Sequence, residues 1–288
     1  MSLKIDNVTF IYDPDTAFSK KALSEVSAEF RRGEFAALLG ATGSGKSTLI
    51  RLLNGLLRPS EGHVRLDGED IWQRGYDRRA LRFRVGMVFQ YPEHQLFEET
   101  VLKDVCFGPS NKGLPEEDRT AAAKRALRLT GLPEELWDKS PFALSGGERR
   151  RAAIAGVLAM EPEYLILDEP AAGLDPKGRR EILQLLKSLQ AESNTGILLV
   201  SHSMEDAAEY ADRILVIDRG RIRMDDTPAS VFSRTEELKE FGLDAPDVSI
   251  ILKKLSEAGF PVNTGCFSVK SAAEEIARLF AEKTAAGR

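Results

Sequence analysis

The chain has 288 residues, of which 30% are charged and 42% hydrophobic, and its formal net charge is −5. This balance is that of an ordinary globular protein and excludes collagen-like, coiled-coil and disordered classes. The length allows one large domain with an appendix, or two domains, and the acidic charge argues against binding to nucleic acid.

The two cysteines and the distribution of apolar residues indicate the cellular compartment in which the protein is expected. Cys106 and Cys266 stand far apart with no cluster of Cys or His beside them, so neither a zinc site nor a disulfide framework is predicted. The first residues show no basic-then-apolar signal pattern, and no apolar run approaches the ~18 residues that cross a bilayer. We therefore expect a cytosolic protein that reaches a membrane only through a partner.

The N-terminal third of the chain contains strand-like stretches that we expect to lie outside the centre of the fold. They cover residues 3–11, 63–66 and 85–89, and the dipeptides Arg32-Gly33 and Asp67-Gly68 resemble hairpin separators. This pattern predicts a small antiparallel sheet beside the core.

Three short apolar runs predict the core itself. Residues 35–39, 164–167 and 197–200 are nearly continuous apolar segments of strand length, which is typical of strands covered on both faces. Residues 46–57 and 177–192 have the pattern of helices. An α/β core is therefore expected.

Two further regions have helical periodicity. Residues from about 93 to 160 are rich in Glu, Lys, Arg and Ala with apolar side chains at helical spacing, and we interpret them as a helical insertion. Beyond residue 235, apolar positions at helical spacing predict two amphipathic helices around a loop of Gly, Pro and Asn. We expect a main domain over residues 1–235 and a small C-terminal module over 236–288.

The strongest chemical signal follows the first core strand, and we call it the phosphate loop. It comprises Gly40, Ala41, Thr42, Gly43, Ser44, Gly45, Lys46, Ser47 and Thr48. The spacing G-x-x-x-x-G-K-S between a strand and a helix is typical of a loop whose backbone N–H groups bind phosphates. Lys46 is expected to reach the β- and γ-phosphates, and Ser47 to offer its hydroxyl to Mg²⁺. A chance glycine-rich turn is the alternative.

An acidic pair ends the second core strand. The strand 164–167 delivers Asp168 and Glu169 to the carboxyl edge of the sheet, where ligands bind in open α/β folds. Asp168 is expected to act on the Mg²⁺, and Glu169 to polarise a water in line with the γ-phosphate. Without the phosphate loop, such a pair is as often a solvated turn.

A second anion-binding device precedes a predicted helix over residues 149–160, and we call it the signature segment. It comprises Leu144, Ser145, Gly146, Gly147 and Glu148. A Ser at an N-cap position followed by glycines exposes the N–H groups of a helix start. Capping and turn geometry alone would also explain these residues. Since one phosphate loop already holds a triphosphate, the signature segment is expected to meet the nucleotide of another subunit.

The order of these motifs closely resembles the ATP-binding cassette ATPases over residues 1 to about 235. The resemblance implies a P-loop NTPase core with an antiparallel β subdomain, a helical insertion and a small C-terminal α/β extension. It also implies a dimer in which ATP lies between the phosphate loop of one subunit and the signature segment of the other.

Four single residues match the family pattern. The resemblance implies that Tyr12 stacks on adenine, that Gln90 senses Mg²⁺ and the attacking water, that Asp175 couples the two subunits, and that His202 contacts the γ-phosphate. Each has a plainer alternative. Tyr12 would pack on the small sheet, Gln90 would be a loop residue, and His202 would be structural. Asp175 would cap the helix 177–192, which is compatible with its coupling role.

Two positions depart from that pattern. The signature segment ends in Glu148 where Gln is usual, and Ala171 stands where Ser or Thr is common. A carboxylate near the second nucleotide would weaken that face unless Arg149 or Arg150 compensates it. Since Ser145 and Gly147 are kept, the site is expected to function.

Residues 89–109, supported by 155–160 and 172–176, resemble the ATPases of energy-coupling factor transporters, including the group associated with cobalt and nickel uptake. This implies a peripheral subunit at the cytoplasmic face of the cell membrane. Its partners would be a second ATPase subunit, identical or paralogous, a transmembrane scaffold protein and a small membrane protein that captures a vitamin or metal ion. A conventional importer ATPase and a soluble ATPase acting on nucleic acid are the alternatives.

Apolar residues of that segment are expected to form a groove for a helix of the scaffold. Tyr91, Leu96 and Phe97 suit such a contact, because a helix in a groove needs an apolar floor. The alternative is that they are ordinary core under the helical insertion. The C-terminal module is expected to help the two ATPase subunits hold together.

Overall fold

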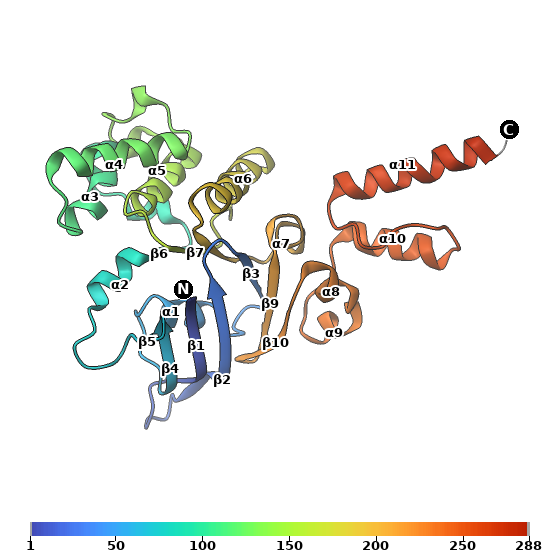
Figure 1. The fold of residues 1–288 in the computed structure, drawn as a ribbon, viewed down its shortest axis with the longest axis horizontal. Coiled ribbons are helices and arrows are strands. Elements are labelled where there is room, and N and C mark those ends of the chain that lie inside the picture. Colours follow the sequence, from blue (N-terminus) through green and yellow to red (C-terminus); the bar gives the residue numbers. More distant parts are fainter. Residues whose placement is uncertain (1, 287–288) are drawn as a thin grey trace.

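The protein is described by a computed structural model that covers residues 2–286. Two sheets lie at its centre (Figure 1). The larger sheet has six strands, all parallel except β10. In their order across the sheet the strands are β10 (Arg221–Asp226), β9 (Arg213–Asp218), β3 (Phe35–Leu39), β8 (Gly196–Val200), β7 (Tyr164–Asp168) and β6 (Val85–Val88).

The three predicted core strands are adjacent in this sheet, in the order β3, β8, β7. Every residue of β3 and β8 is buried, as expected for continuous apolar strands covered on both faces. All three strands run in the same direction, so their carboxyl ends meet at one edge. The predicted α/β core is confirmed.

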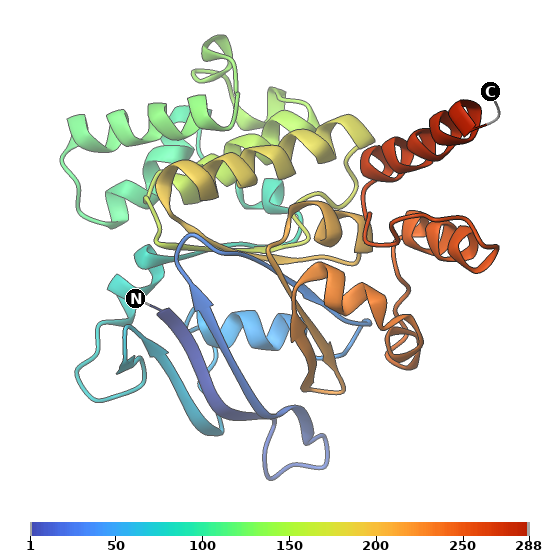
Figure 2. The same ribbon diagram turned by 45° about the vertical axis from the view of Figure 1, so that its right-hand side comes forward.

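The smaller sheet is antiparallel and lies against one face of the larger one (Figure 2). Asp67-Gly68 forms the predicted hairpin turn, and both of its residues have positive φ, 54° and 88°. In spatial order its strands are β2 (Lys20–Arg31), β1 (Ser2–Tyr12), β4 (Glu61–Leu66) and β5 (Glu69–Asp70).

Two expectations about this sheet are wrong. Residues 85–89 do not join it, because β6 pairs in parallel with β7 at the edge of the large sheet. All four residues of β6 are buried, which is the burial of a core strand rather than of a half-exposed hairpin strand. Arg32-Gly33 does not close a hairpin either, since it links β2 in one sheet to β3 in the other.

Helices cover both faces of the large sheet. Helix α1 (Lys46–Leu53) packs with the small sheet on one face, and α6 (Pro176–Ser193) packs with the helical insertion on the other. Short helices α2 (Arg78–Arg84) and α7 (Met204–Tyr210) lie beside β6 and β3. Helix α1 ends at Leu53, four residues before the predicted end, because Asn54 and Gly55 close it.

The helical insertion contains α3 (Val101–Asn111), α4 (Glu116–Leu129) and α5 (Gly146–Leu158). Helix α5 begins three residues earlier than predicted, since the two glycines of the signature segment already form its first turn. Three 3₁₀ turns connect these helices to the core and to one another. They are Pro92–Gln95, Glu134–Leu136 and Pro141–Ala143.

The C-terminal extension lies at the opposite end of the molecule from the helical insertion (Figure 1). It was expected as a small α/β unit, but within the described residues it contains helices only. The segment between α10 and α11 lacks an alternating apolar run, and α8 packs over β9 and β10 instead. Helix α8 (Pro228–Ser233) precedes the extension, whose helices are α9 (Thr235–Glu240), α10 (Asp247–Glu257) and α11 (Val269–Ala286).

Candidate functional site

The phosphate loop is wedged between strands of both sheets. It leaves the buried end of β3, and a Cβ added at Gly40 would lie 2.3 Å from the carbonyl oxygen of Ile217 in β9. Gly45 has φ +114°, and a Cβ there would lie 2.9 Å from the carbonyl oxygen of Ala22 in β2. Both positions therefore require glycine, and the contacts with β9 and β2 hold the loop in place.

Lys46 begins α1 and is almost entirely buried, with 7% of its surface exposed. Its Nζ donates hydrogen bonds to the carbonyl oxygens of Gly40 at 2.6 Å and Ala41 at 3.1 Å. Burial lowers the pKa of this ammonium, and the charges of Glu169 and Asp168 oppose that shift. Since α1 starts at Lys46, this cation lies at a helix N-terminus, which is an environment suited to phosphate.

The acidic pair lies at the end of β7, as predicted. Burial, followed by the charge of Glu169, raises the pKa of the Asp168 carboxyl, while Lys46 acts in the opposite direction. Glu169 has φ 49° and its N–H donates to the carbonyl oxygen of Val200 at 3.0 Å. The backbone turns sharply at the strand end, and both carboxylates lie close enough to Lys46 to influence its charge.

His202 meets Glu169 at the same sheet edge. It follows β8, and its Nε2 lies 2.7 Å from Oε1 of Glu169. The two side chains line a small cavity of about 130 Å³ together with Ser201 and Ser203. Residues that are far apart in the sequence, Lys46, Asp168, Glu169 and His202, thus converge on one place.

The donor set fits a hard divalent cation. Asp168 supplies a partly buried carboxylate, and Ser47 in the first turn of α1 has an exposed side chain. Within the described residues no three His, Cys, Asp or Glu side chains form a metal cluster. The oxygens of Asp168 and Ser47 suit Mg²⁺, which proteins hold through one or two oxygens while substrate phosphates supply others. Gln90 follows β6, the neighbour of β7, and is exposed.

Tyr12 lies beside the helix of the phosphate loop. Its hydroxyl is 3.1 Å from Oγ1 of Thr48, and its ring meets Phe10 edge-on at 4.8 Å between centroids. The ring therefore does pack on the small sheet, at a position next to the first turn of α1. Stacking on adenine stays a prediction.

The signature segment caps α5 and lies in a different pocket. Ser145 Oγ accepts from the N–H of Glu148 at 3.3 Å, and the Glu148 carboxylate accepts from the N–H of Ser145 at 2.8 Å and from its hydroxyl at 2.7 Å. Cβ atoms added at Gly146 or Gly147 would touch nothing within 4 Å. Ser145 and Gly146 are exposed, Gly147 and Glu148 are half-buried, and Leu144 is buried. The side chains of Ser145 and Glu148 are engaged in this capping box.

The structure explains how Glu148 replaces the usual Gln. Hydrogen bonds from Ser145 lower the pKa of the Glu148 carboxyl, with a smaller effect from the charge of Lys139. Arg150 does not compensate Glu148, because its guanidinium is bound elsewhere. The extra charge is accommodated mainly by the helix cap itself.

The start of α6 borders the same pocket. Asp175 caps this helix by accepting from the N–H of Gly178 at 3.0 Å, so the plainer role holds. The pocket, of about 450 Å³, is lined by the first turns of α5 and α6, and Glu181 in its wall forms ion pairs with Arg151 and Lys177. It contains no residue of the phosphate loop. The predicted site residues therefore form two groups.

Arg150 connects these two groups of site residues. This connecting role is not predicted from the sequence. Only 3% of its side chain is exposed, and it binds Glu93 through two hydrogen bonds of 2.6 and 2.9 Å. It also donates to the carbonyl oxygens of Pro170, at 3.1 Å, and Ala172. The arginine thus ties α5 to the segment after Gln90 and to the turn after Glu169. A buried arginine between two others, Arg149 and Arg151, gives no distinct sequence signal.

The apolar segment after Gln90 is divided between surface and core. Tyr91 and Phe97 are exposed by 43% and 58%, and Phe97 meets Phe107 edge-on at 5.0 Å. Leu96, in contrast, is buried in the helical core, so the groove floor expected there is wrong for this residue. A buried leucine and an exposed phenylalanine have the same apolar signal in the sequence.

Comparison with known proteins agrees with this geometry. The family model described as ABC transporter matches residues 23–172. A protein of Clostridium tetani, named energy-coupling factor transporter ATP-binding protein EcfA2, is 51% identical over 98% of this chain and 99% of its own length. The protein of the same name from Bacillus subtilis is 49% identical over 93% and 99%.

The chain belongs to the energy-coupling factor transporter ATP-binding proteins, within the ABC transporter family. Among solved structures, cbiO1 from Clostridium perfringens, described as part of the ABC transporter complex cbiONQ, has a TM-score of 0.74 at 37% identity and covers 89% of this chain and 97% of its own. The cassette MJ0796, solved as a dimer with ADP and Pi, has a TM-score of 0.70 at 30% identity and covers 79% and 99%. Membership of the ABC transporter family makes this chain an ATPase with the P-loop NTPase fold.

Proposed function

We propose that the chain is the ATP-hydrolysing subunit of an energy-coupling factor importer, and that Glu169 polarises the attacking water. The observation that carries the chemistry is the convergence of Lys46, Asp168, Glu169 and His202 at one sheet edge. A buried cation for phosphate and a carboxylate with a histidine partner are what hydrolysis of a phosphoanhydride requires.

The phosphate loop binds the triphosphate of ATP. Lys46 exchanges its bonds to the Gly40 and Ala41 carbonyls for phosphate oxygens, while the N–H groups of the loop hold the rest of the charge. Tyr12, beside Thr48, stacks on the adenine ring. Because the loop is already wedged between two sheets, its backbone loses little conformational freedom on binding.

Bound Mg²⁺ would be held by Ser47, Asp168 and Gln90, and would neutralise charge on the phosphates. Glu169 accepts the proton of the water, and His202, which contacts Glu169 at 2.7 Å before ATP arrives, turns to the γ-phosphate. Both side chains come from adjacent parallel strands, so the sheet fixes their spacing.

A second ATPase subunit completes each site. Ser145, Gly146 and Gly147 of one subunit cover the γ-phosphate bound to the other, and Asp175 contacts the opposite subunit. The support is that the signature segment and the start of α6 share one open pocket that excludes the phosphate loop. The helices of the C-terminal extension add contact between the subunits, since Val269 and Phe280 on α11 are largely exposed.

Membrane partners engage the segment after Gln90. Tyr91 and Phe97 form an apolar contact for a helix of a transmembrane scaffold protein, and a small membrane protein captures the cargo, a vitamin or a cobalt or nickel ion. The subunit then lies at the cytoplasmic face of the membrane. Within the described residues no helix is both long and apolar enough to cross a bilayer.

Affinity purification from detergent-solubilised membranes of the host tests this assignment. A tagged wild-type chain should retain a multi-span scaffold and a small membrane protein, both identified by mass spectrometry. Phe97→Ser should weaken this recovery at least threefold. The matched control Phe142→Ser alters an exposed aromatic residue of the same helical insertion and should leave recovery unchanged. Recovery of conventional permease subunits, or of soluble partners only, would exclude the importer assignment.

A further inference from the structure

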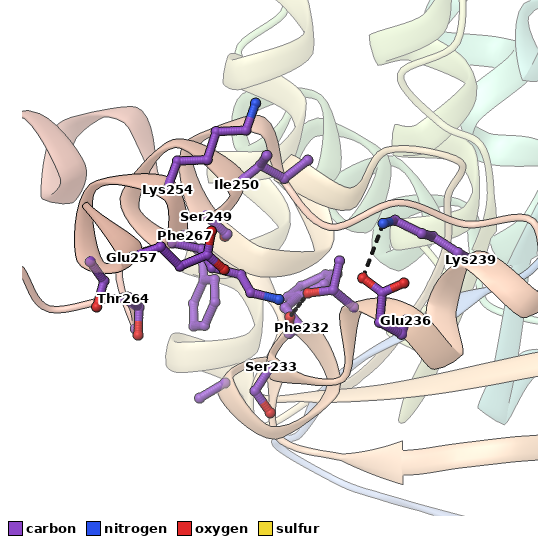
Figure 3. Close-up of a pocket in the computed structure, with 15 residues that line it drawn as sticks. Phe232, Ser233, Glu236, Lys239, Ser249, Ile250, Lys254, Glu257, Thr264 and Phe267 are labelled. Atoms are coloured by element: carbon purple, nitrogen blue, oxygen red, sulfur yellow. Dashed lines mark hydrogen bonds and ion pairs between the residues drawn. The ribbon is translucent and has the colours of Figure 1, made fainter. Parts of the chain in front are cut away.

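Two pockets of the chain are each lined by an ion pair, and the two pairs differ in burial. In a pocket of about 610 Å³ between α8, α9 and α10, Glu236 lies 3.1 Å from Lys239, and both side chains are largely exposed (Figure 3). In the pocket of the signature segment, Glu93 lies 2.6 Å from Arg150, and their side chains are only 11% and 3% exposed. An exposed pair contributes little to a fold, whereas a buried pair is kept only where its hydrogen bonds are satisfied.

The guanidinium of Arg150 makes four hydrogen bonds to two different segments. Its Nε and Nη2 donate to the two carboxylate oxygens of Glu93, at 2.9 and 2.6 Å. Its Nη1 donates to the carbonyl oxygens of Pro170, at 3.1 Å, and Ala172. No backbone N–H of the described residues donates to these two carbonyls. Because a guanidinium is planar and rigid, it fixes both segments relative to α5.

Glu93 anchors the arginine from one side. Burial acts to raise the pKa of the Glu93 carboxyl, but hydrogen bonds from Arg150, its own N–H and the Arg150 charge together bring this pKa below its ordinary value. The ring of Tyr91 adds a second contact, with its centre 5.8 Å from the guanidinium carbon. The segment after Gln90 therefore sets the direction in which the other donors of Arg150 point.

The two carbonyls on the other side belong to the turn that follows Glu169. Pro170 is the next residue, and the N–H of Ala172 donates to the carbonyl oxygen of Glu169 at 3.1 Å. The same turn leads to Asp175, the cap of α6. A shift of Arg150 would therefore shift the backbone that carries the Glu169 side chain. Misplacement of a reacting group by about 1 Å can cost roughly 10²-fold in rate.

Arg150 lies on the helix that begins with the signature segment. Ser145 caps α5, and Arg150 follows it by little more than one helical turn. The backbone hydrogen bonds of α5 make this stretch rigid. One side chain thus sets the position of the turn after Glu169 relative to the signature segment.

We propose that Arg150 is a positioning residue for ATP hydrolysis, which holds the turn after Glu169 in place relative to the signature segment and is itself oriented by Glu93. It acts through the turn and not on the nucleotide. The inference rests on the function proposed above, in which Glu169 and the signature segment serve hydrolysis. Undiminished hydrolysis by Glu169→Gln would remove both ideas, whereas its loss in Glu169→Gln together with an unaffected Arg150→Lys would remove the positioning role alone.

The test compares kcat with KM in the purified full chain. Arg150→Lys keeps a positive charge beside Glu93, but an ammonium cannot hold a carboxylate by two bonds and two carbonyls at the same time. Its kcat for ATP hydrolysis should fall at least about tenfold. KM for ATP and ADP affinity in calorimetry should stay within twofold, because the phosphate loop is untouched. A wild-type kcat, or a loss of ADP affinity as large as the loss of kcat, would overturn the proposal.

Arg84→Lys is the matched control. Arg84 also donates to both oxygens of a glutamate, Glu163, at 2.7 and 2.9 Å, but it lies outside the nucleotide site. Thermal unfolding should show a loss of stability in both lysine variants, and the assay is run below both transitions. The kcat of Arg84→Lys should stay within twofold of the wild type. Equal losses of kcat in the two variants would show that hydrolysis follows stability and not the position of the turn.

A double-variant cycle tests the anchoring role of Glu93. Glu93→Gln should lower kcat about threefold or more, and Arg150→Lys/Glu93→Gln should lie within twofold of Arg150→Lys, because both residues act through one guanidinium. Losses that multiply would exclude Glu93 as the anchor. Hydrogen exchange should become faster at residues 171–175 in Arg150→Lys and stay unchanged at residues 40–48. Unchanged exchange at residues 171–175 would also overturn the proposal.

Discussion

Two helix N-termini in this chain are suited to bind anions, and they are built in opposite ways. At α1, neighbouring strands press on the glycines of the phosphate loop, and Lys46 is buried among them. At α5, the glycines of the signature segment face open space, and Ser145 is exposed. The phosphate loop is held in shape by contacts within its own chain, whereas no part of the described chain packs against the glycines of the signature segment, which we propose to face a second subunit. Variants at the two helix N-termini and at the residue that links them test this difference.

The largest effect is expected at the complete site. Glu169→Gln should lower the steady-state rate of ATP hydrolysis by roughly 10²–10⁴-fold, because the amide cannot accept a proton from water. ATP affinity should be retained, since Lys46 and the loop are untouched, and a closed dimer should accumulate on a sizing column. Undiminished hydrolysis would remove Glu169 from its proposed role.

Lys46→Ala is the matched contrast and should give the reverse pattern. Removing a charge-assisted phosphate contact should weaken ATP binding by roughly 10- to 150-fold, as measured by calorimetry. Hydrolysis falls as a consequence. Unchanged ATP affinity would count against the phosphate loop as the nucleotide site.

The second prediction concerns Arg150, which links the two groups of site residues. Arg150→Met leaves Glu93 buried without its partner and should destabilise the fold by about 3–5 kcal/mol in urea unfolding. The double variant Arg150→Met/Glu93→Leu should recover a large part of that loss. Arg128→Met is the control, because its ion pair with Glu134 is exposed and is worth at most about 1 kcal/mol. Equal losses in Arg150→Met and Arg128→Met would show that the buried pair does not join the segments.

The third prediction concerns the open half-site. Gly147→Val places a branched side chain where a second subunit would approach, and the cavity around it is empty. ATP affinity of the isolated chain should stay within twofold, and hydrolysis should fall by at least about tenfold, a barrier increase of about 1.4 kcal/mol. A variant that hydrolyses ATP at the wild-type rate would mean that the segment does not face the nucleotide.

The smallest effect is expected at the helix cap. Glu148→Gln keeps an acceptor for Ser145, so at neutral pH its stability should change by less than about 1 kcal/mol. The pKa of Glu148 is lowered in the folded state, so its carboxylate stabilises the fold above the unfolded pKa. That contribution is lost as pH falls below about 4.5, the ordinary value for this group. Thermal unfolding of both proteins between pH 7 and pH 3 should therefore converge, and parallel curves would exclude a charged cap.

The sequence was sufficient for the parts of the fold with a periodic or fixed pattern. Strands such as β3 are continuous apolar runs, and the phosphate loop has glycines at positions that only glycine tolerates. The convergence of Asp168 and His202 on Lys46 also followed, because parallel strands end at one edge of a sheet.

Other features depend on contacts between residues that are far apart in the sequence, and local patterns do not predict such contacts. The assignment of β6 to the large sheet depends on β7, which begins at Tyr164, and nothing within residues 85–88 specifies that pairing. Arg150 and Glu93 are also far apart in the sequence, and no pattern at either residue predicts their ion pair. Leu96 is buried while its neighbour Phe97 is exposed. The domain boundary near residue 235 and the roles of the site residues stay predictions.

The order of strands also has a consequence for how the protein is made. Strand β3 is complete at Leu39, but its two neighbours, β8 and β9, begin only at Gly196 and Arg213. At roughly 5–20 residues per second, a ribosome takes on the order of ten seconds or more to produce them. During that time a fully apolar strand has no partner on either side. The emerging chain therefore needs a chaperone or its own small sheet to shield β3, and slower translation before residue 196 would favour aggregation over folding.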